Sequence, residues 1–179
     1  MNKTIVSLHY MHDAPYFDTE SRSLMKIAVF SDTHRHIDGV IAAVNQYKPD
    51  LIIHLGDHYR DAQNLHMEFP YIPMECVPGN CDYAPEEDVV KLIEPMGVRI
   101  MLTHGHTYRV KYETMPLLNA AFFQGAQIVL YGHTHTPTYT LVQGLHVVNP
   151  GSAGQGRHPT WAKIELEDGR IKDIRLMDI

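Results

Sequence analysis

The stretch that decides the fold is Ile27-Ala28-Val29-Phe30-Ser31-Asp32-Thr33-His34. Its four consecutive apolar residues suit a strand that is buried on both faces, as in the parallel sheet of an α/β domain. Asp32 and His34 then follow the carboxyl end of that strand, where open α/β sheets place their ligand sites. Side chains two residues apart in an extended segment lie on the same side, so both can bind one ion. A single Asp-x-His pair also fits an ordinary turn, and the interpretation depends on whether similar pairs recur.

Four more apolar runs along the chain end in polar residues of the same kinds. The runs and the residues that follow them are 51–55 with Gly56-Asp57, 74–77 with Gly79-Asn80, 98–102 with Thr103-His104-Gly105-His106, and 127–131 with Gly132-His133-Thr134-His135. Each of these junctions, taken alone, is a common turn sequence. Together the five predict that carboxylate, amide and imidazole groups gather at one edge of a sheet, because parallel strands place their carboxyl ends there.

Helices are expected between these strands. Apolar side chains recur at Ile37, Val40, Ile41 and Val44, which predicts an amphipathic helix over 37–47. Further helices are expected over 61–67 and 114–124, and a hairpin over 89–93 and 98–102. Beyond residue 138 the pattern changes to short alternating strands with turn residues between them, which predicts an antiparallel meander over 139–142, 146–148, 160–166 and 171–176.

Composition limits the classes of protein that fit. The chain has 179 residues, a formal net charge of −6 and 44% hydrophobic residues, which is typical of one globular domain. The negative charge argues against tight binding to nucleic acid or to an anionic membrane. No stretch reaches the ~20 apolar residues that span a bilayer. Thirteen histidines suggest metal or proton chemistry, and only two cysteines favour a reducing compartment, the cytoplasm.

The first 24 residues differ from the rest of the chain. They mix histidine, acidic residues and proline without helical or strand periodicity, which predicts a flexible N-terminal extension over 1–24 and a single domain over 25–179. An alternative is that residues 3–8 add an edge strand to the sheet.

The ordered motifs Asp32-Thr33-His34, Gly56-Asp57, Gly79-Asn80, His104 and Gly132-His133-Thr134-His135 resemble the calcineurin-like metallophosphoesterase superfamily. The short chain and its opening strand look most like the small prokaryotic phosphodiesterases of the YfcE type, over about residues 25–177. The resemblance implies an α/β fold in which a β-sandwich of two mixed sheets is flanked by helices, in four layers ordered α-β-β-α. It also implies a dinuclear metal centre at the sheet edge.

The resemblance assigns ligands to two divalent metal ions. One ion is expected to bind Asp32, His34, Asp57 and His135, and the other Asp57, Asn80, His104 and His133. Asp57 then bridges the two. Nitrogen and oxygen ligands admit Mn²⁺ as the first choice, with Fe, Ni, Zn or Co as alternatives. Two carboxylates against two dications leave a local positive charge, which attracts a phosphate to an acidic protein.

The implied reaction is hydrolysis of a phosphate ester by in-line attack of a hydroxide that bridges the two metals, with Asp57 and Asn80 in the catalytic centre. The proton donor for the leaving group is open. Many phosphatases of the superfamily carry histidine directly after the asparagine, whereas this chain has Cys81. A thiol is a weak general acid, which favours diesters with stable leaving groups. His106, two residues beyond His104, is the alternative donor.

Two other functions fit the same residues. One is a phosphomonoesterase of the same fold. The other is a non-catalytic metal-binding scaffold that resembles the retromer subunit, since fold alone does not prove catalysis. The complete set of seven matching ligand positions favours an enzyme that acts on a small phosphate ester. We expect no nucleic acid or membrane partner, and the resemblance implies a homodimer or homotetramer.

Overall fold

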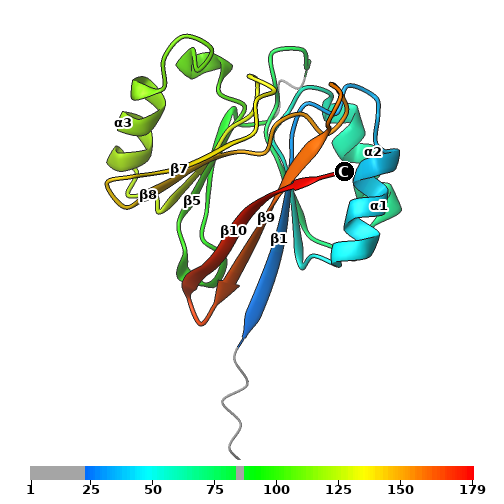
Figure 1. Ribbon diagram of the computed structural model, residues 1–179, viewed down its shortest axis with the longest axis horizontal. Coiled ribbons are helices and arrows are strands. Elements are labelled where there is room, and N and C mark those ends of the chain that lie inside the picture. The colour runs from blue at the N-terminus through cyan, green and yellow to red at the C-terminus, as the bar shows by residue number, and fades with distance from the viewer. Residues whose placement is uncertain (1–22, 84–86) are drawn as a thin grey trace, which may run out of the picture.

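Two five-stranded sheets form the centre of the structure, a computed structural model that describes residues 23–83 and 87–179 (Figure 1). The first sheet has the strand order β10-β9-β1-β2-β3 and the second has the order β4-β5-β6-β8-β7. Both sheets are mixed, because β1-β2-β3 and β5-β6-β8 are parallel while the remaining pairs are antiparallel. The strands are β1 Leu24–Phe30, β2 Leu51–His54, β3 Met74–Cys76, β4 Val90–Ile93, β5 Ile100–Thr103, β6 Ile128–Leu130, β7 Thr138–Val142, β8 Leu145–Asn149, β9 Thr160–Glu167 and β10 Arg170–Asp178.

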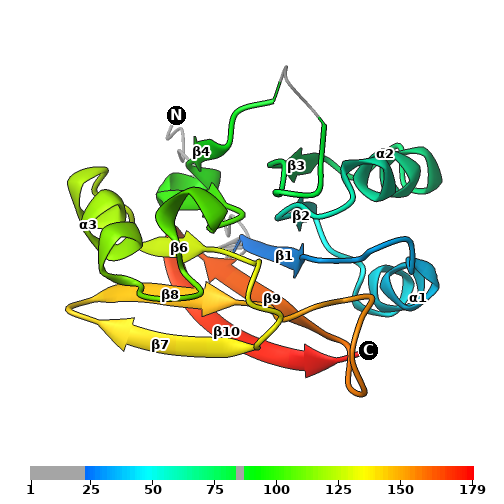
Figure 2. The same ribbon diagram turned by 90° about the horizontal axis from the view of Figure 1, so that it is seen from above.

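Helices cover the outer faces of both sheets. Seen from above, α1 (Asp38–Tyr47) and α2 (Tyr59–Glu68) lie on one side of the molecule, and α3 (Met115–Phe123) lies on the other (Figure 2). Two short 3-10 helices, η1 (Pro95–Gly97) and η2 (His106–Tyr108), occupy loops of the second half. The predicted four-layer arrangement of helix, sheet, sheet and helix is therefore confirmed.

Side-chain alternation along the strands fills three apolar layers. Ile27 and Val29 of β1 point into the layer between the sheets, where they meet Ile100 of β5. Ala28 and Phe30 point the other way, into the layer beneath α1. Because both faces of β1 are covered, its last four residues are all fully buried, as an apolar run without polar alternation predicts. A third layer lies between the second sheet and α3.

The predicted antiparallel meander is wrong. β7 pairs with β8 and β9 pairs with β10 in antiparallel hairpins, as expected. However, β8 belongs to the second sheet, where it is parallel to β6, and β9 crosses to the first sheet, where it pairs with β1. Period-two alternation identifies a strand, but it does not say which of two sheets the strand joins.

The chain begins its first strand slightly earlier than expected. β1 starts at Leu24, which pairs with Glu167 of β9. Most of the predicted extension, and the alternative edge strand over 3–8, lie outside the described residues. Among the helices that the structure does describe, none combines the length and the apolar character that crossing a membrane requires.

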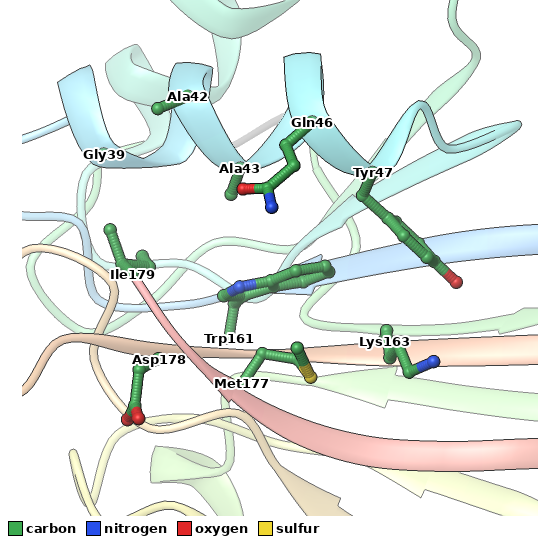
Figure 3. Close-up of a pocket in the computed structure, with 10 residues that line it drawn as sticks. All are labelled: Gly39, Ala42, Ala43, Gln46, Tyr47, Trp161, Lys163, Met177, Asp178 and Ile179. Atoms are coloured by element: carbon green, nitrogen blue, oxygen red, sulfur yellow. The ribbon is translucent and has the colours of Figure 1, made fainter.

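A cleft of about 490 Å³ lies between α1 and the strands β9 and β10 (Figure 3). Trp161 lines it and stacks on Phe30 with ring centroids 5.5 Å apart, while Tyr47 meets the Trp161 ring edge-on at 5.2 Å. The side chain of Ile179 lies against Gly39, so closely that a Cβ on Gly39 would collide with it. None of the predicted site residues lines this cleft.

Candidate metal centre

The loops that follow β1, β2, β3, β5 and β6 meet at one edge of the two sheets. Backbone hydrogen bonds join them: Asp32 N–H donates to the Gly56 carbonyl at 3.0 Å, and Gly132 N–H donates to the His104 carbonyl at 3.1 Å. The Ser152 hydroxyl donates to the Asp32 carbonyl at 2.7 Å. These hydrogen bonds hold neighbouring loops together independently of any ion.

Side-chain nitrogen and oxygen atoms form two groups at this edge, and within each group the candidate ligand atoms lie within 4.8 Å of one another. The first group is Asp32, His34, Asp57 and His135, and the second is Asp57, His104 and His133. The Asp57 carboxylate belongs to both. Its Oδ2 lies 3.8 Å from His34 Nε2, and its Oδ1 lies 3.4 Å from His104 Nε2. A carboxylate placed in this way can bridge two ions.

The structure also brings Asn80, the seventh predicted ligand, to the second group. Asn80 Oδ1 lies 3.2 Å from His104 Nε2. The next residue, Cys81, donates its backbone N–H to Asp57 Oδ1 at 3.0 Å. The loop after β3 therefore contacts both the bridging carboxylate and a histidine of the second sheet.

Five of the seven predicted ligands have a left-handed backbone. Their φ angles are Asp32 54°, His34 44°, Asp57 55°, His133 68° and His135 57°. Residues other than glycine adopt this region uncommonly, and such conformations carry strain of about 1–3 kcal/mol each. Backbone strain of this kind gathers at functional sites, and no residue pattern in the sequence revealed it.

Glycine is required at two of the junctions by close approach. A Cβ on Gly79 would overlap Asp57 Oδ1, and a Cβ on Gly132 would overlap the Ser31 hydroxyl oxygen. The glycine before Asn80 and the glycine before His133 therefore make room for the carboxylates of the cluster. This is a reason for both glycines beyond the turn propensity that the sequence suggested.

His104 is held in one orientation. Its side chain is fully buried, and Nδ1 lies 2.7 Å from the Leu55 carbonyl, which can only accept a hydrogen bond. Nδ1 therefore carries the proton, and Nε2 has its lone pair directed at Asp57 and Asn80. Burial lowers the pKa of His104 to about 4, against the partial opposing effect of the Asp57 charge. A neutral imidazole is the form that binds metals.

The other ionisable side chains of the cluster also have shifted pKa values. Burial raises the pKa of Asp32 to about 6. Although burial acts in the opposite direction, the Cys81 N–H and the neighbouring His104 hold the pKa of Asp57 below its ordinary value. Burial, followed by the positive charge of Lys111, lowers the pKa of both His133 and His135.

Unpaired polar atoms indicate that the cluster fits a metal. In the described part of the chain, three buried side-chain atoms lack a hydrogen-bond partner, and all belong to this region: Asp32 Oδ1, His106 Nδ1 and His133 Nδ1. Asp32 Oδ1 lies 3.1 Å from His135 Nε2 without the alignment of a hydrogen bond. Buried polar atoms without partners are rare in folded proteins. Mixed carboxylate, amide and imidazole ligands suit divalent transition metals.

A buried network supports the loop after β1, and the sequence did not reveal it. The Thr33 hydroxyl donates to Asp61 Oδ2 at 2.7 Å, and the Arg35 backbone N–H donates to the same oxygen at 2.7 Å. Thr33 Oγ1 also lies 3.1 Å from His54 Nε2. Burial lowers the pKa of His54 to about 4. Asp61 on α2 thus holds the two residues that alternate with Asp32 and His34. The only signal was its position four residues after Asp57.

Asp82 supports the neighbouring loop in a similar way. Its Oδ1 accepts hydrogen bonds from the backbone N–H groups of His58 at 2.9 Å and Tyr59 at 2.7 Å, and its Oδ2 accepts one from Gly79 at 2.8 Å. The carboxylate therefore joins the start of α2 to the Gly79-Asn80 loop.

The two predicted proton donors, Cys81 and His106, both lie beside members of the second group. Cys81 is exposed, and its sulfur accepts a hydrogen bond from Asn80 Nδ2 at 3.3 Å. Burial and the Asp57 carboxylate raise the pKa of the Cys81 thiol, which makes it a poorer acid. The His106 ring lies 5.5 Å from that of His104 and 6.2 Å from that of His133, centroid to centroid.

This geometry agrees with the comparison to known families. The family model described as the calcineurin-like phosphoesterase superfamily domain matches residues 25–169. The chain belongs to the calcineurin-like phosphoesterase superfamily. A probable metallophosphoesterase of Mycoplasma pneumoniae is 30% identical over 84% of this chain and 96% of its own. A phosphodiesterase of Methanocaldococcus jannaschii is 27% identical over 71% of this chain and 83% of its own.

Two solved structures show the same fold. A predicted phosphoesterase of Streptococcus pneumoniae superposes with a TM-score of 0.73 at 28% identity, over 87% of this chain and 90% of its own. Vps29 of Entamoeba histolytica, solved in complex with Zn²⁺, superposes with a TM-score of 0.68 at 19% identity, over 86% of this chain and 99% of its own. The second likeness shows the fold alone.

Proposed function

We propose that this protein is a metal-dependent phosphodiesterase that hydrolyses a small phosphate ester. The observation that carries the proposal is the convergence of seven carboxylate, amide and imidazole side chains from five strand ends, with Asp57 shared between two groups. The phosphodiesterase of Methanocaldococcus jannaschii among the relatives supports the choice of reaction.

In this proposal the Asp32 group (Asp32, His34 and His135) holds one divalent ion and the Asn80 group (Asn80, His104 and His133) holds another, with Asp57 common to both. Mn²⁺ is the first choice, and Fe, Ni, Zn or Co also suit the ligands. When bound, such ions act as Lewis acids on a phosphoryl oxygen and lower the pKa of water.

The chain's own side chains orient the ligand atoms, add positive charge and donate a proton. His104 presents Nε2 because its Nδ1–H donates a hydrogen bond to the Leu55 carbonyl. Lys111 adds positive charge beside His133 and His135, which favours an anionic substrate. For the leaving oxygen we propose His106 as the proton donor, because burial and the Asp57 carboxylate raise the pKa of the Cys81 thiol and make it a poorer acid than an ordinary thiol.

The alternatives make different use of the same cluster. A phosphomonoesterase would need the same metals, and the cysteine that follows Asn80 argues against it. A scaffold like the retromer subunit would need the fold but no turnover, and the Vps29 likeness is compatible with it. The complete ligand cluster favours the enzyme. A cytoplasmic location and a homodimer or homotetramer stay predictions.

The test is hydrolysis of bis-(p-nitrophenyl) phosphate and p-nitrophenyl phosphate by metal-stripped protein, with Mn²⁺ added back. We expect Mn²⁺-dependent cleavage that prefers the diester. Asp57→Asn removes the charge shared by both groups, and we expect it to lower the rate by about a thousandfold or more, equivalent to several kcal/mol of lost stabilisation.

The matched control is Asp38→Asn, which removes an exposed carboxylate at the start of α1 and should leave the rate unchanged. Absence of turnover with Mn²⁺, and with Fe, Ni, Zn or Co added in its place, while the protein still binds the metal, would refute catalysis and favour the scaffold. A preference for the monoester would instead favour the phosphomonoesterase.

A further inference from the structure

A second pocket lies directly beside the Asn80 group. It has a volume of about 380 Å³ and lies between the loop after β3 and the loop after β5. Its lining includes Pro78, Asn80, Tyr83, Val89 and His106. The volume lies within the range of roughly 300–1,000 Å³ that is usual for small-molecule pockets. Because Asn80 belongs to both the cluster and the pocket wall, a phosphate ester bound at the cluster has this pocket within reach of one of its organic groups.

The lining of the pocket suits an uncharged group. No lysine or arginine is among the described residues that line it, so it offers no permanently cationic side chain to a further phosphate. The one carboxylate in its wall, Asp82, has both oxygens occupied by backbone N–H groups of His58, Tyr59 and Gly79. The remaining side chains are apolar or aromatic, apart from Asn80 and His106.

Two apolar side chains of the pocket wall, Tyr83 and Val89, are open to solvent. Tyr83 is 97% exposed and Val89 is 44% exposed. An aromatic ring whose faces are free can stack on a planar ligand. Such stacking contributes to the binding free energy and does not depend on which planar ring is bound. The two side chains would be covered by a planar group that enters the pocket.

We propose that this pocket is the subsite for one organic group of the substrate, and that the group is a planar aromatic ring stacked on Tyr83. The proposal rests on the proposed function, and it narrows the substrate to phosphate esters that carry an aryl group or a nucleobase. An alkyl ester leaves the subsite empty and should bind less tightly.

The experiment measures binding rather than turnover, by calorimetry on the Mn²⁺-loaded full chain. The probes are phenylphosphonate, adenosine 5′-monophosphate and methylphosphonate. We expect Tyr83→Ala to weaken the binding of at least one aromatic probe by roughly tenfold and to leave methylphosphonate unchanged. Tyr83→Phe keeps the ring and should retain binding. A loss confined to phenylphosphonate assigns an aryl group to the subsite, and a loss confined to the nucleotide assigns a nucleobase.

The matched control is Tyr71→Ala, since Tyr71 is also 97% exposed and lies before β3, at the other end of the strand. It should change none of the three affinities. Equal affinities of wild type and Tyr83→Ala for both aromatic probes would overturn the subsite, as would an equal loss for methylphosphonate. If wild-type protein bound none of the probes and cleaved neither nitrophenyl ester, the proposed function itself would fail.

Discussion

The Asp32 group and the Asn80 group share Asp57 but are built in different ways. In the Asp32 group all three members have a left-handed backbone, and the histidines are partly open, with 16% of the His34 side chain and 35% of the His135 side chain exposed. In the Asn80 group His104 is fully buried and held by the Leu55 carbonyl. The Asn80 group therefore contains a buried, hydrogen-bonded ring that the Asp32 group lacks, although its other histidine, His133, shares the left-handed backbone.

The two groups should therefore respond differently to mutation. The loop of the Asp32 group is held from outside by Asp61, through Thr33 and Arg35. A change in that support alters the group without touching a ligand. His104, in contrast, is both a candidate ligand and a core residue, so its loss affects the site and the stability of the fold together.

Of the differences expected between the two groups, the largest should separate His104→Ala from His34→Ala. Both should lower diester hydrolysis more than about a hundredfold, since each removes a candidate ligand. His104→Ala should also lower the free energy of unfolding by about 3–4 kcal/mol, because it leaves a cavity and an unpaired Leu55 carbonyl. His34→Ala should change it by less than about 1 kcal/mol. Urea unfolding of the metal-free proteins measures the difference, and equal losses would contradict it.

Acidification should destabilise the metal-free protein. The pKa values of His54 and His104 are about 4, below their ordinary value of 6.5. The unfolded chain therefore binds more protons than the folded protein between pH 6.5 and 4. As the pH falls through that window, the folded protein loses roughly 3 kcal/mol of stability for each of the two histidines.

Asp32 acts in the opposite direction. Its pKa is raised from 3.8 to about 6, so the folded state binds the extra proton and gains stability as the pH falls from 6 to 3.8. The net loss for two histidines and one carboxyl group is roughly 3 kcal/mol. Urea unfolding at pH 7 and at pH 4.5 checks it. His54→Gln should remove most of the net slope, and a stability that rises on acidification would contradict the assignment.

A smaller effect is expected from Asp61→Leu, which removes the outside support of the Asp32 group. Loss of a residue that holds metal ligands in position weakens metal binding by about 10- to 100-fold. Asp61→Asn keeps an acceptor for Thr33 and should lose less. Calorimetric titration with Mn²⁺ should show the loss at one of two sites only.

The matched control for Asp61→Leu is Leu65→Ala, which opens a cavity under the same helix at a fully buried position. It should lower the melting temperature while it leaves the Mn²⁺ affinity unchanged. If the two variants weakened Mn²⁺ binding equally, Asp61 would be a structural residue only.

Much of the site could be predicted from the sequence, because it follows from strand ends. Apolar runs such as 27–30 and 51–55 identify buried strands, and the carboxyl ends of parallel strands share one edge. The residues that end each run are therefore expected at one site from the sequence alone. The types of ligand residue at these positions also indicate the family, and the comparison confirms it.

The rest depends on contacts between distant residues. Asp61 and His54 support Thr33 through side chains that meet only after α2 packs on the first sheet. The sheet to which β9 belongs is decided by pairing with β1 over a separation of more than a hundred residues, and local alternation carries no information on it. The left-handed backbone of His133 and His135 is likewise not indicated by their residue type.

The candidate ligands are divided between the two sheets. Asp32, His34, Asp57 and Asn80 follow strands of the first sheet, while His104, His133 and His135 follow strands of the second. Any ion held by either group is therefore a cross-link between the two halves of the sandwich, and its binding free energy is added to the folding free energy. The resistance of the sandwich to opening at this edge would then be set by the free metal concentration in the cell as well as by the apolar layer beneath it.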